Sequence, residues 1–153
     1  MRRPIALLAV LVFAAAALAG TAAIASSATS KPATVKTATS SLGRIVVDGR
    51  SHTLYLFEKD KRGKSACSGA CAQNWPPLLT KGKPRAGTAA KASLLGTTRR
   101  ADGTTQVTYN GHPLYTFVGD NGKPGATKGE GLDAFGAKWY VVAAKGTERT
   151  GRY

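Results

Sequence analysis

The chain has 153 residues and carries 22 Lys and Arg against 8 Asp and Glu, which gives a formal net charge of +14. It contains no G-x-S-x-G nucleophile sequence and no phosphate-binding loop, and its few acidic residues form no pair typical of a glycosidase. We therefore expect a protein that is not an enzyme. The basic residues are spread through every loop, which is typical of a solvated surface and argues against nucleic-acid binding.

The N-terminal residues have the pattern of an export signal. Two arginines precede an apolar run at residues 5–18, and small residues follow. Ala23-Ile24-Ala25 matches a cleavage site, so we expect residues 1–25 to be a signal peptide and Ser26 to begin the mature chain. Loss of the two arginines lowers the charge of the mature chain from +14 to +12. Without cleavage, the same segment is long enough to cross a membrane.

Thr21 stands where a bacterial lipoprotein has the cysteine that carries the lipid. Without that cysteine no lipid can be attached there, so we expect a secreted or cell-envelope-associated protein. The expected partners are wall polyanions or other envelope components, which bind through charge and are released by salt. A membrane is a partner only if the signal is not cleaved.

Composition divides the rest of the chain into three parts. Residues 26–42 are rich in Ser, Thr, Ala and Lys with almost no large apolar residue, and we predict a flexible spacer. Residues 43–145 are predicted to form a single domain, and residues 146–153 a tail. Within the domain we place repeat one at about residues 44–80 and repeat two at about residues 94–143.

The domain contains one short sequence twice. The pattern H-x-L-Y-x-F-x-x-D occurs at residues 52–60 and again at residues 112–120, and a tryptophan follows each copy, as Trp75 and Trp139. A duplicated β-unit with loops of slightly different length produces this pattern.

Turn signals place hairpins around each copy. Asp48-Gly49 and Asn110-Gly111 precede the two copies, and residues 101–103 mark a further hairpin. Residues 139–142 read as a closing strand, and the helical signal is one to two turns at residues 68–74, ended by Trp-Pro-Pro. We therefore predict a mainly β fold: a small antiparallel sheet or sandwich of two hairpin-containing pseudo-repeats, with one short helical turn near the cysteines.

Strand alternation separates the side chains of the repeated sequence. Tyr55 and Phe57 share one face, and Leu54 and Leu56 lie on the other. In repeat two Thr116 replaces the second leucine, so we predict that this face of the strand is more exposed to solvent there.

The aromatic residues are predicted to form the core of the sheet. If they were exposed instead, they would stack on sugars, which gives glycan binding as an alternative. The set comprises Tyr55, Phe57, Trp75, Tyr109, Tyr115, Phe117, Phe135, Trp139 and Tyr140. Asp60 and Asp120 end their strands at turn sequences, where we expect them to accept hydrogen bonds from backbone N–H groups ahead of them.

Cys67 and Cys71 are four residues apart, which on one helical turn places their Cα atoms about 6 Å apart, within bridging distance. In an exported protein we expect a disulfide. The alternative is a redox or copper(I) site, in which His52 or His112 completes the thiolate ligands. Both histidines follow turns, and we expect them to be hydrogen-bonded locally and not to bind metal.

The motif Y-x-[FWY]-x-x-D, present at residues 55–60 and 115–120, resembles that of the bacterial lipoproteins called secreted repeat of unknown function. The cysteine–tryptophan segment at residues 67–78 and the Gly-Ala-Lys-Trp-Tyr-Val-Val segment at residues 136–142 are also similar to that family. The resemblance covers nearly the whole predicted domain and implies an exported, envelope-associated protein. The chain differs at Thr21, where many members have the lipidated cysteine.

Three hypotheses about function follow. The first is an exported, envelope-associated β-repeat protein with a non-catalytic binding or structural role and no cofactor. The second is an extracytoplasmic redox or copper-handling protein that uses Cys67 and Cys71. The third, weaker hypothesis is a polyanion- or glycan-binding protein.

Overall fold

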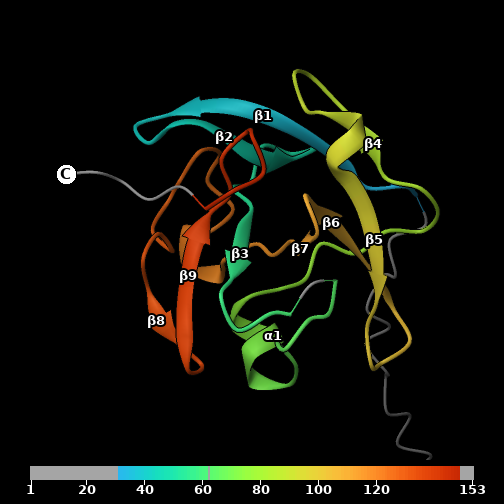
Figure 1. The fold of residues 1–153 in the computed structure, drawn as a ribbon. Helices are drawn as coiled ribbons and strands as arrows, with labels where there is room; N and C mark the ends of the chain where they lie inside the picture. Colours follow the sequence, from blue (N-terminus) through green and yellow to red (C-terminus); the bar gives the residue numbers. More distant parts are fainter. Residues whose placement is uncertain (1–30, 62, 149–153) are drawn as a thin grey trace, which may run out of the picture.

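The structure, a computed structural model, describes residues 31–61 and 63–148 (Figure 1). It confirms a mainly β fold with one short helix near the cysteines. The strands form three small sheets, with strand orders β2-β1-β4, β3-β9-β8 and β5-β6-β7. The predicted signal peptide, its cleavage site before Ser26 and the last five residues of the predicted tail lie outside the described residues.

The strands are short and joined mainly by turns. They are β1 (Thr34–Ser40), β2 (Gly43–Asp48), β3 (Tyr55–Phe57), β4 (Arg85–Ala86), β5 (Leu95–Arg99), β6 (Thr105–Tyr109), β7 (His112–Pro113), β8 (Asp133–Ala134) and β9 (Ala137–Val141). The helix is α1 (Ala70–Asn74), and two 3₁₀ turns are η1 (Ala92–Leu94) and η2 (Val118–Asp120). No helix in the described ranges is long and apolar enough to cross a membrane.

The predicted hairpins are present. Strands β5 and β6 meet at residues 101–103, and β6 turns into β7 through Asn110 and Gly111, both at positive φ. Such a turn requires φ above zero at both central residues, which Asn and Gly adopt at low cost. The helix α1 falls within the predicted 68–74 segment.

The prediction of a flexible spacer over residues 26–42 is wrong for its second half. Thr34–Ser40 forms β1, which pairs antiparallel with β2 and parallel with β4. Val35 and Thr37 are buried and alternate with half-buried neighbours, so the strand has a period of two built from small and β-branched residues. Because the inward residues are not large and apolar, the composition of this segment does not indicate the alternation. Repeat one therefore begins with the β1–β2 hairpin, the counterpart of β5–β6.

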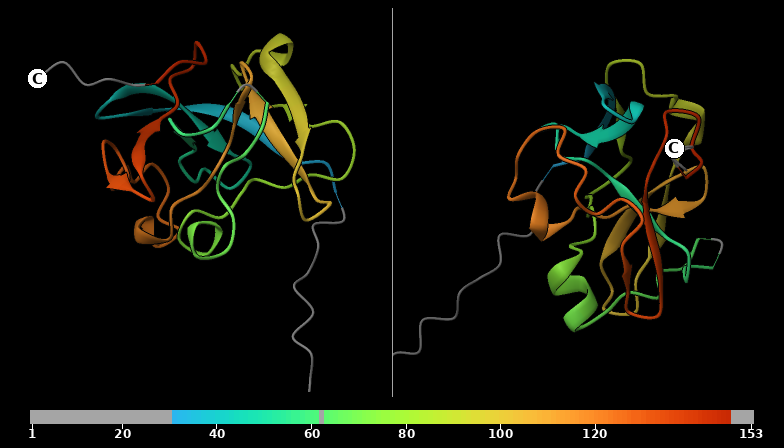
Figure 2. Two further views of the ribbon diagram at one scale, coloured as in Figure 1. Left: turned by 60° about the horizontal axis from the view of Figure 1, so that its bottom comes forward. Right: turned by 90° about the vertical axis from the view of Figure 1, so that its left-hand side faces the viewer.

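The two repeats are interleaved. The motif strand of repeat one, β3, pairs with the Trp139 strand of repeat two, with Tyr55 opposite Val141. In the reciprocal contact, Tyr115 of repeat two forms a bridge to Pro77, just after the tryptophan of repeat one. Figure 2 shows the result, in which the red C-terminal strand lies among strands from the N-terminal half. One sheet thus contains strands of both repeats, and an isolated bridge joins the repeats a second time.

The predicted alternation along the motif strand is confirmed. Tyr55 and Phe57 belong to one buried cluster, together with both tryptophans and both cysteines. Leu54 and Leu56 belong to a second cluster on the opposite face. The strand β3 therefore separates two small cores.

Candidate functional site

The centre of the molecule is a stack of four aromatic rings. Trp75 and Trp139 lie face to face at 4.0 Å between centroids with an interplanar angle of 3°. Phe117 stacks on the outer face of Trp75 at 4.2 Å, and Phe57 stacks on the outer face of Trp139 at 4.0 Å. Both tryptophans are almost fully buried. These four motif residues are core, as predicted, and the tryptophans are not available for stacking on a sugar.

One member of the predicted aromatic core lies elsewhere. Phe135 is 41% exposed at the turn between β8 and β9, with a φ of +61°. The hairpin places it at the tip, so here the prediction was wrong.

The tyrosine and aspartate of the motif pair across the repeats. The Tyr55 hydroxyl lies 2.7 Å from Asp120 Oδ2, and the Tyr115 hydroxyl lies 2.8 Å from Asp60 Oδ2. The other carboxylate oxygen of each aspartate accepts a backbone N–H, from Lys128 for Asp120 and from Ala66 for Asp60. The predicted backbone bonds are thus present, and the sequence did not reveal the tyrosine partners.

Burial raises the pKa values of the aspartates and tyrosines in these pairs. Desolvation raises the pKa of Asp60 to about 6, although the N–H of Ala66, the Tyr115 hydroxyl and the charge of Arg100 act in the opposite direction. Desolvation also raises the pKa of Asp120. The pKa values of both tyrosines are raised, first by burial and then by the neighbouring carboxylates, so the phenols stay protonated and act as donors.

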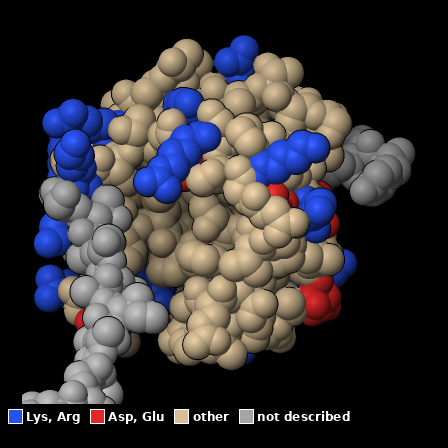
Figure 3. All heavy atoms as spheres, turned by 180° about the vertical axis from the view of Figure 1, so that it is seen from behind, with Lys and Arg blue, Asp and Glu red and all other residues tan. Residues whose placement is uncertain are grey.

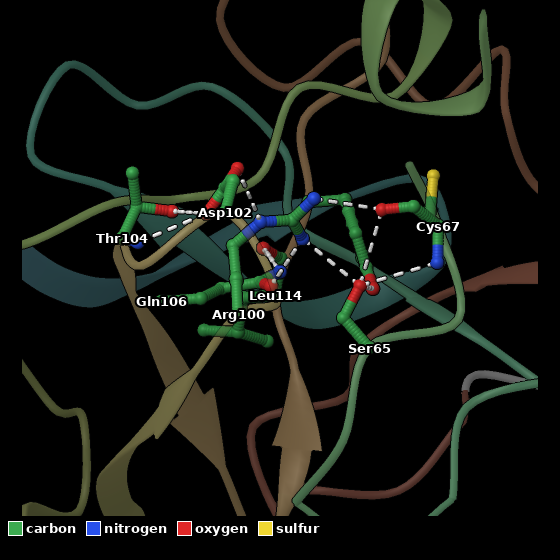
Figure 4. A network of polar contacts seen from close by, with 8 residues as sticks. Ser65, Cys67, Arg100, Asp102, Thr104, Gln106 and Leu114 are labelled. Atoms are coloured by element: carbon green, nitrogen blue, oxygen red, sulfur yellow. Dashed lines mark hydrogen bonds and ion pairs between the residues drawn. The ribbon is translucent and has the colours of Figure 1, made fainter. Parts of the chain in front are cut away.

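A buried arginine connects this region to the cysteine loop (Figure 4). The guanidinium of Arg100 donates to Ser65 Oγ at 2.9 Å, to Gln106 Oε1 at 2.8 Å and to the carbonyl of Cys67 at 2.7 Å. Its ion pair with the exposed Asp102 is longer, at 3.6 Å. Sequence reasoning missed Arg100, because an arginine beside a hairpin turn usually faces solvent.

Cys67 and Cys71 are joined by a disulfide, with a Cα–Cα distance of 5.3 Å. Both residues are buried. The histidines have separate surroundings: His52 Nδ1 lies 3.1 Å from Asp48 Oδ2, and half-buried His112 lines a cavity with Asp60. Within the described ranges, no group of three or more His, Cys, Asp and Glu residues could hold a metal ion.

The carboxylates are less exposed than the cations: four of the eight are exposed, and the other four are buried or half-buried. Six of the eight carboxylates accept internal hydrogen bonds: Asp48, Glu58, Asp60, Asp102, Asp120 and Glu130. Among the described Lys and Arg, all but half-buried Lys36 and buried Arg100 are exposed.

The fold gathers part of this positive charge on one side. Residues 31–47 and 61–101 contain no Asp or Glu, and the β1–β4 pairing brings the two segments together, with Thr34 opposite Arg85. We define the basic face as Lys31, Lys36, Lys81, Lys83, Arg85 and Lys91. Figure 3, seen from behind, shows Lys and Arg gathered along the left edge, the side on which β4 and β5 lie in Figure 1.

A family model described as secreted repeat of unknown function matches residues 36–79 and 96–143. The first match begins within β1 and the second within β5, in agreement with the structural repeats. No curated protein and no solved structure shows significant similarity to the chain. The two matches together span more than half of the chain, so the protein belongs to this family of secreted repeats.

Proposed function

We propose that the chain is an extracytoplasmic, non-catalytic binding protein that attaches to anionic polymers of the cell envelope through its basic face. The observation that carries this proposal is a difference in exposure between the two kinds of charge. Four of the eight carboxylates, those of Asp48, Asp60, Asp120 and Glu130, are buried or half-buried and accept hydrogen bonds, whereas nearly all of the described lysines and arginines are exposed. The solvent-facing charge is therefore more positive than the composition suggests. The description of the family as secreted supports a location where such polymers occur.

The β1–β4 pairing supports a specific surface for this contact. Lys36 on β1 lies beside Gly87, which follows β4, so close that a Cβ at Gly87 would be 3.1 Å from the Lys36 Cβ. Basic side chains from two distant segments thus share one surface, with no acidic residue in either segment. Exposed charges of this kind attract a polyanion over about 8–10 Å in physiological salt, and the attraction weakens as salt rises.

The test is retention of the purified mature protein on isolated bacterial cell walls at low and high NaCl. We expect strong retention at low salt, loss at high salt, and loss on walls from which the anionic polymers have been extracted with acid. The charge-reversed variant Lys83→Glu/Arg85→Glu should lose most of the retention. Lys59→Glu/Lys138→Glu makes the same charge change away from the basic face and serves as the control. Equal losses for the two variants, or retention that salt does not alter, would contradict the proposal.

A further inference from the structure

Two cavities meet at His52. A cavity of about 390 Å³ lies between β1, the turn after β2 and residues 77–79, and a cavity of about 200 Å³ lies between Pro76, η2 and the residues after it. His52 and Thr116 line both. The larger volume falls within the roughly 300–1,000 Å³ of small-molecule sites. It is also lined by Thr34 of β1, so it adjoins the basic face.

The ring of His52 is held in one orientation. Asp48 Oδ2 lies 3.1 Å from Nδ1, and Asp48 Oδ1 accepts the backbone N–H groups of His52 and Arg50, each at 2.8 Å. In the neutral imidazole, Nδ1–H donates to this carboxylate, and Nε2 is then a hydrogen-bond acceptor. Nε2 faces Gly122, where an added Cβ would lie 3.7 Å away, and has no hydrogen bond to the described residues. A fixed acceptor thus stands where the two cavities join.

A second polar group beside the smaller cavity lacks a partner. Thr53 lines this cavity, and its Oγ1 is buried without a hydrogen bond. Rotation about χ1 toward a ligand would break no existing hydrogen bond, because Oγ1 makes none. A buried hydroxyl without a hydrogen bond costs free energy. A ligand that forms a hydrogen bond with it removes this cost, which favours binding.

The two repeats differ at this place. Leu56 of repeat one is buried in the second core, whereas its counterpart Thr116 is only half-buried and lines both cavities. One wall of the smaller cavity is apolar, formed by Pro76, Phe117 and the exposed Val118. Asp120 and Gly122 complete the lining, and both carboxylate oxygens of Asp120 already accept hydrogen bonds, from Tyr55 and Lys128. The site therefore combines a fixed acceptor and two hydroxyls with an apolar wall large enough to cover a methyl group.

The two cavities that share His52 and Thr116 together form one cleft. We propose that this cleft binds one N-acetylated amino-sugar unit of the anionic envelope polymer. The amide N–H is the donor that His52 Nε2 requires, and the acetyl methyl group fits the wall formed by Pro76, Phe117 and Val118. One sugar hydroxyl pairs with Thr53, and another donates to Thr116 Oγ1, whose own proton bonds the Pro76 carbonyl. The inference rests on the proposed function only for the source of the sugar. The cleft recognises one sugar unit, and the adjoining basic face binds the charged groups on the rest of the polymer.

The test is a titration of the full mature protein with N,N′-diacetylchitobiose, followed by ¹H–¹⁵N chemical shifts. We expect saturable shifts confined to residues around His52, Thr53 and Phe117, and much weaker shifts with cellobiose, which has a hydroxyl in place of the acetamido group. Thr53→Val keeps the shape and should weaken binding about tenfold. His52→Phe should abolish binding, and His112→Phe, at the matching position of repeat two, should leave it unchanged.

Three results would overturn the inference: absence of saturable shifts at His52, equal affinity for cellobiose, or unchanged affinity in Thr53→Val. The probe is uncharged and does not engage the basic face. If sugar binding fails while wall retention stays intact and sensitive to salt, only the proposal for the cleft is refuted. If wall retention is absent while sugar binding is intact, only the proposed contact with the polyanion is refuted.

Discussion

Tyr55 and Tyr115 exchange both of their backbone hydrogen bonds, with N···O distances of 2.8 and 3.0 Å. This pair lies where the two repeats meet, and each hydroxyl reaches the aspartate of the other repeat. The tyrosine and aspartate side chains of the family motif thus form their hydrogen bonds between the repeats and not within either one. Its tyrosine and aspartate hold the interleaved halves together.

The first prediction concerns chain continuity. Fragments 31–86 and 87–148 should each be unfolded alone, because each lacks the tryptophan strand or the motif strand that its partner supplies. Mixed in equal amounts, they should regain the β-sheet circular dichroism of the intact chain. A stable sheet signal from one fragment alone would show that the repeats fold independently.

The second prediction concerns pH. The raised pKa of Asp60 means that the folded state binds more protons than the unfolded state between pH 4 and 6, so stability should fall as pH rises through this window and stay lower above it. Asp60→Asn removes this titration, so its free energy of unfolding should change less between pH 4 and 7 than that of the wild type. Urea denaturation at both pH values measures the difference, and parallel changes in the two proteins would refute the assignment.

The third prediction concerns Arg100. Arg100→Ala should lower the free energy of unfolding by about 3 kcal/mol, because Ser65, Gln106 and the Cys67 carbonyl lose a charged donor in a buried site. Asp102→Asn is the matched test of the exposed end of the same side chain, and it should cost about 0–1 kcal/mol. Urea unfolding curves compare the two, and equal effects would show that the ion pair is the main contribution.

The fourth prediction concerns the ring stack. Trp139→Ala should destabilise the protein by about 3–5 kcal/mol, because it leaves a cavity between Trp75 and Phe57. Phe135→Ala removes an exposed ring from the same hairpin and should change stability by no more than about 0.5 kcal/mol. Chemical denaturation of both variants is the measurement, and a small loss for Trp139→Ala would mean that the stack is not the central core.

The fifth prediction concerns the disulfide. The Cys67→Ala/Cys71→Ala variant should lose only about 2 kcal/mol, because the closed loop is short. In the wild type, a thiol reagent with mild reductant should detect no thiols until denaturant is added, since both cysteines are buried. Rapid reduction of the native protein would point instead to an accessible, functional cysteine pair.

Local sequence signals determined much of this protein. The repeated motif, the Asn110-Gly111 turn and the alternation along residues 54–57 predict hairpins, a mainly β fold and the division of Tyr and Phe from Leu. These features depend on period and turn chemistry, which neighbouring residues encode. The same kind of reasoning missed β1, because its inward residues are small and its pairing strength comes from the neighbouring strands.

The tertiary structure decided everything that depends on two distant residues. The sequence shows two tyrosines and two aspartates but cannot show that each tyrosine bonds the aspartate about sixty residues away. It shows scattered lysines but not that β1 and β4 bring them to one face, nor that the histidine of repeat one stands at the junction of two cavities. Contacts of this kind arise from the interleaving of the repeats, and no local pattern specifies how two similar units exchange their strands.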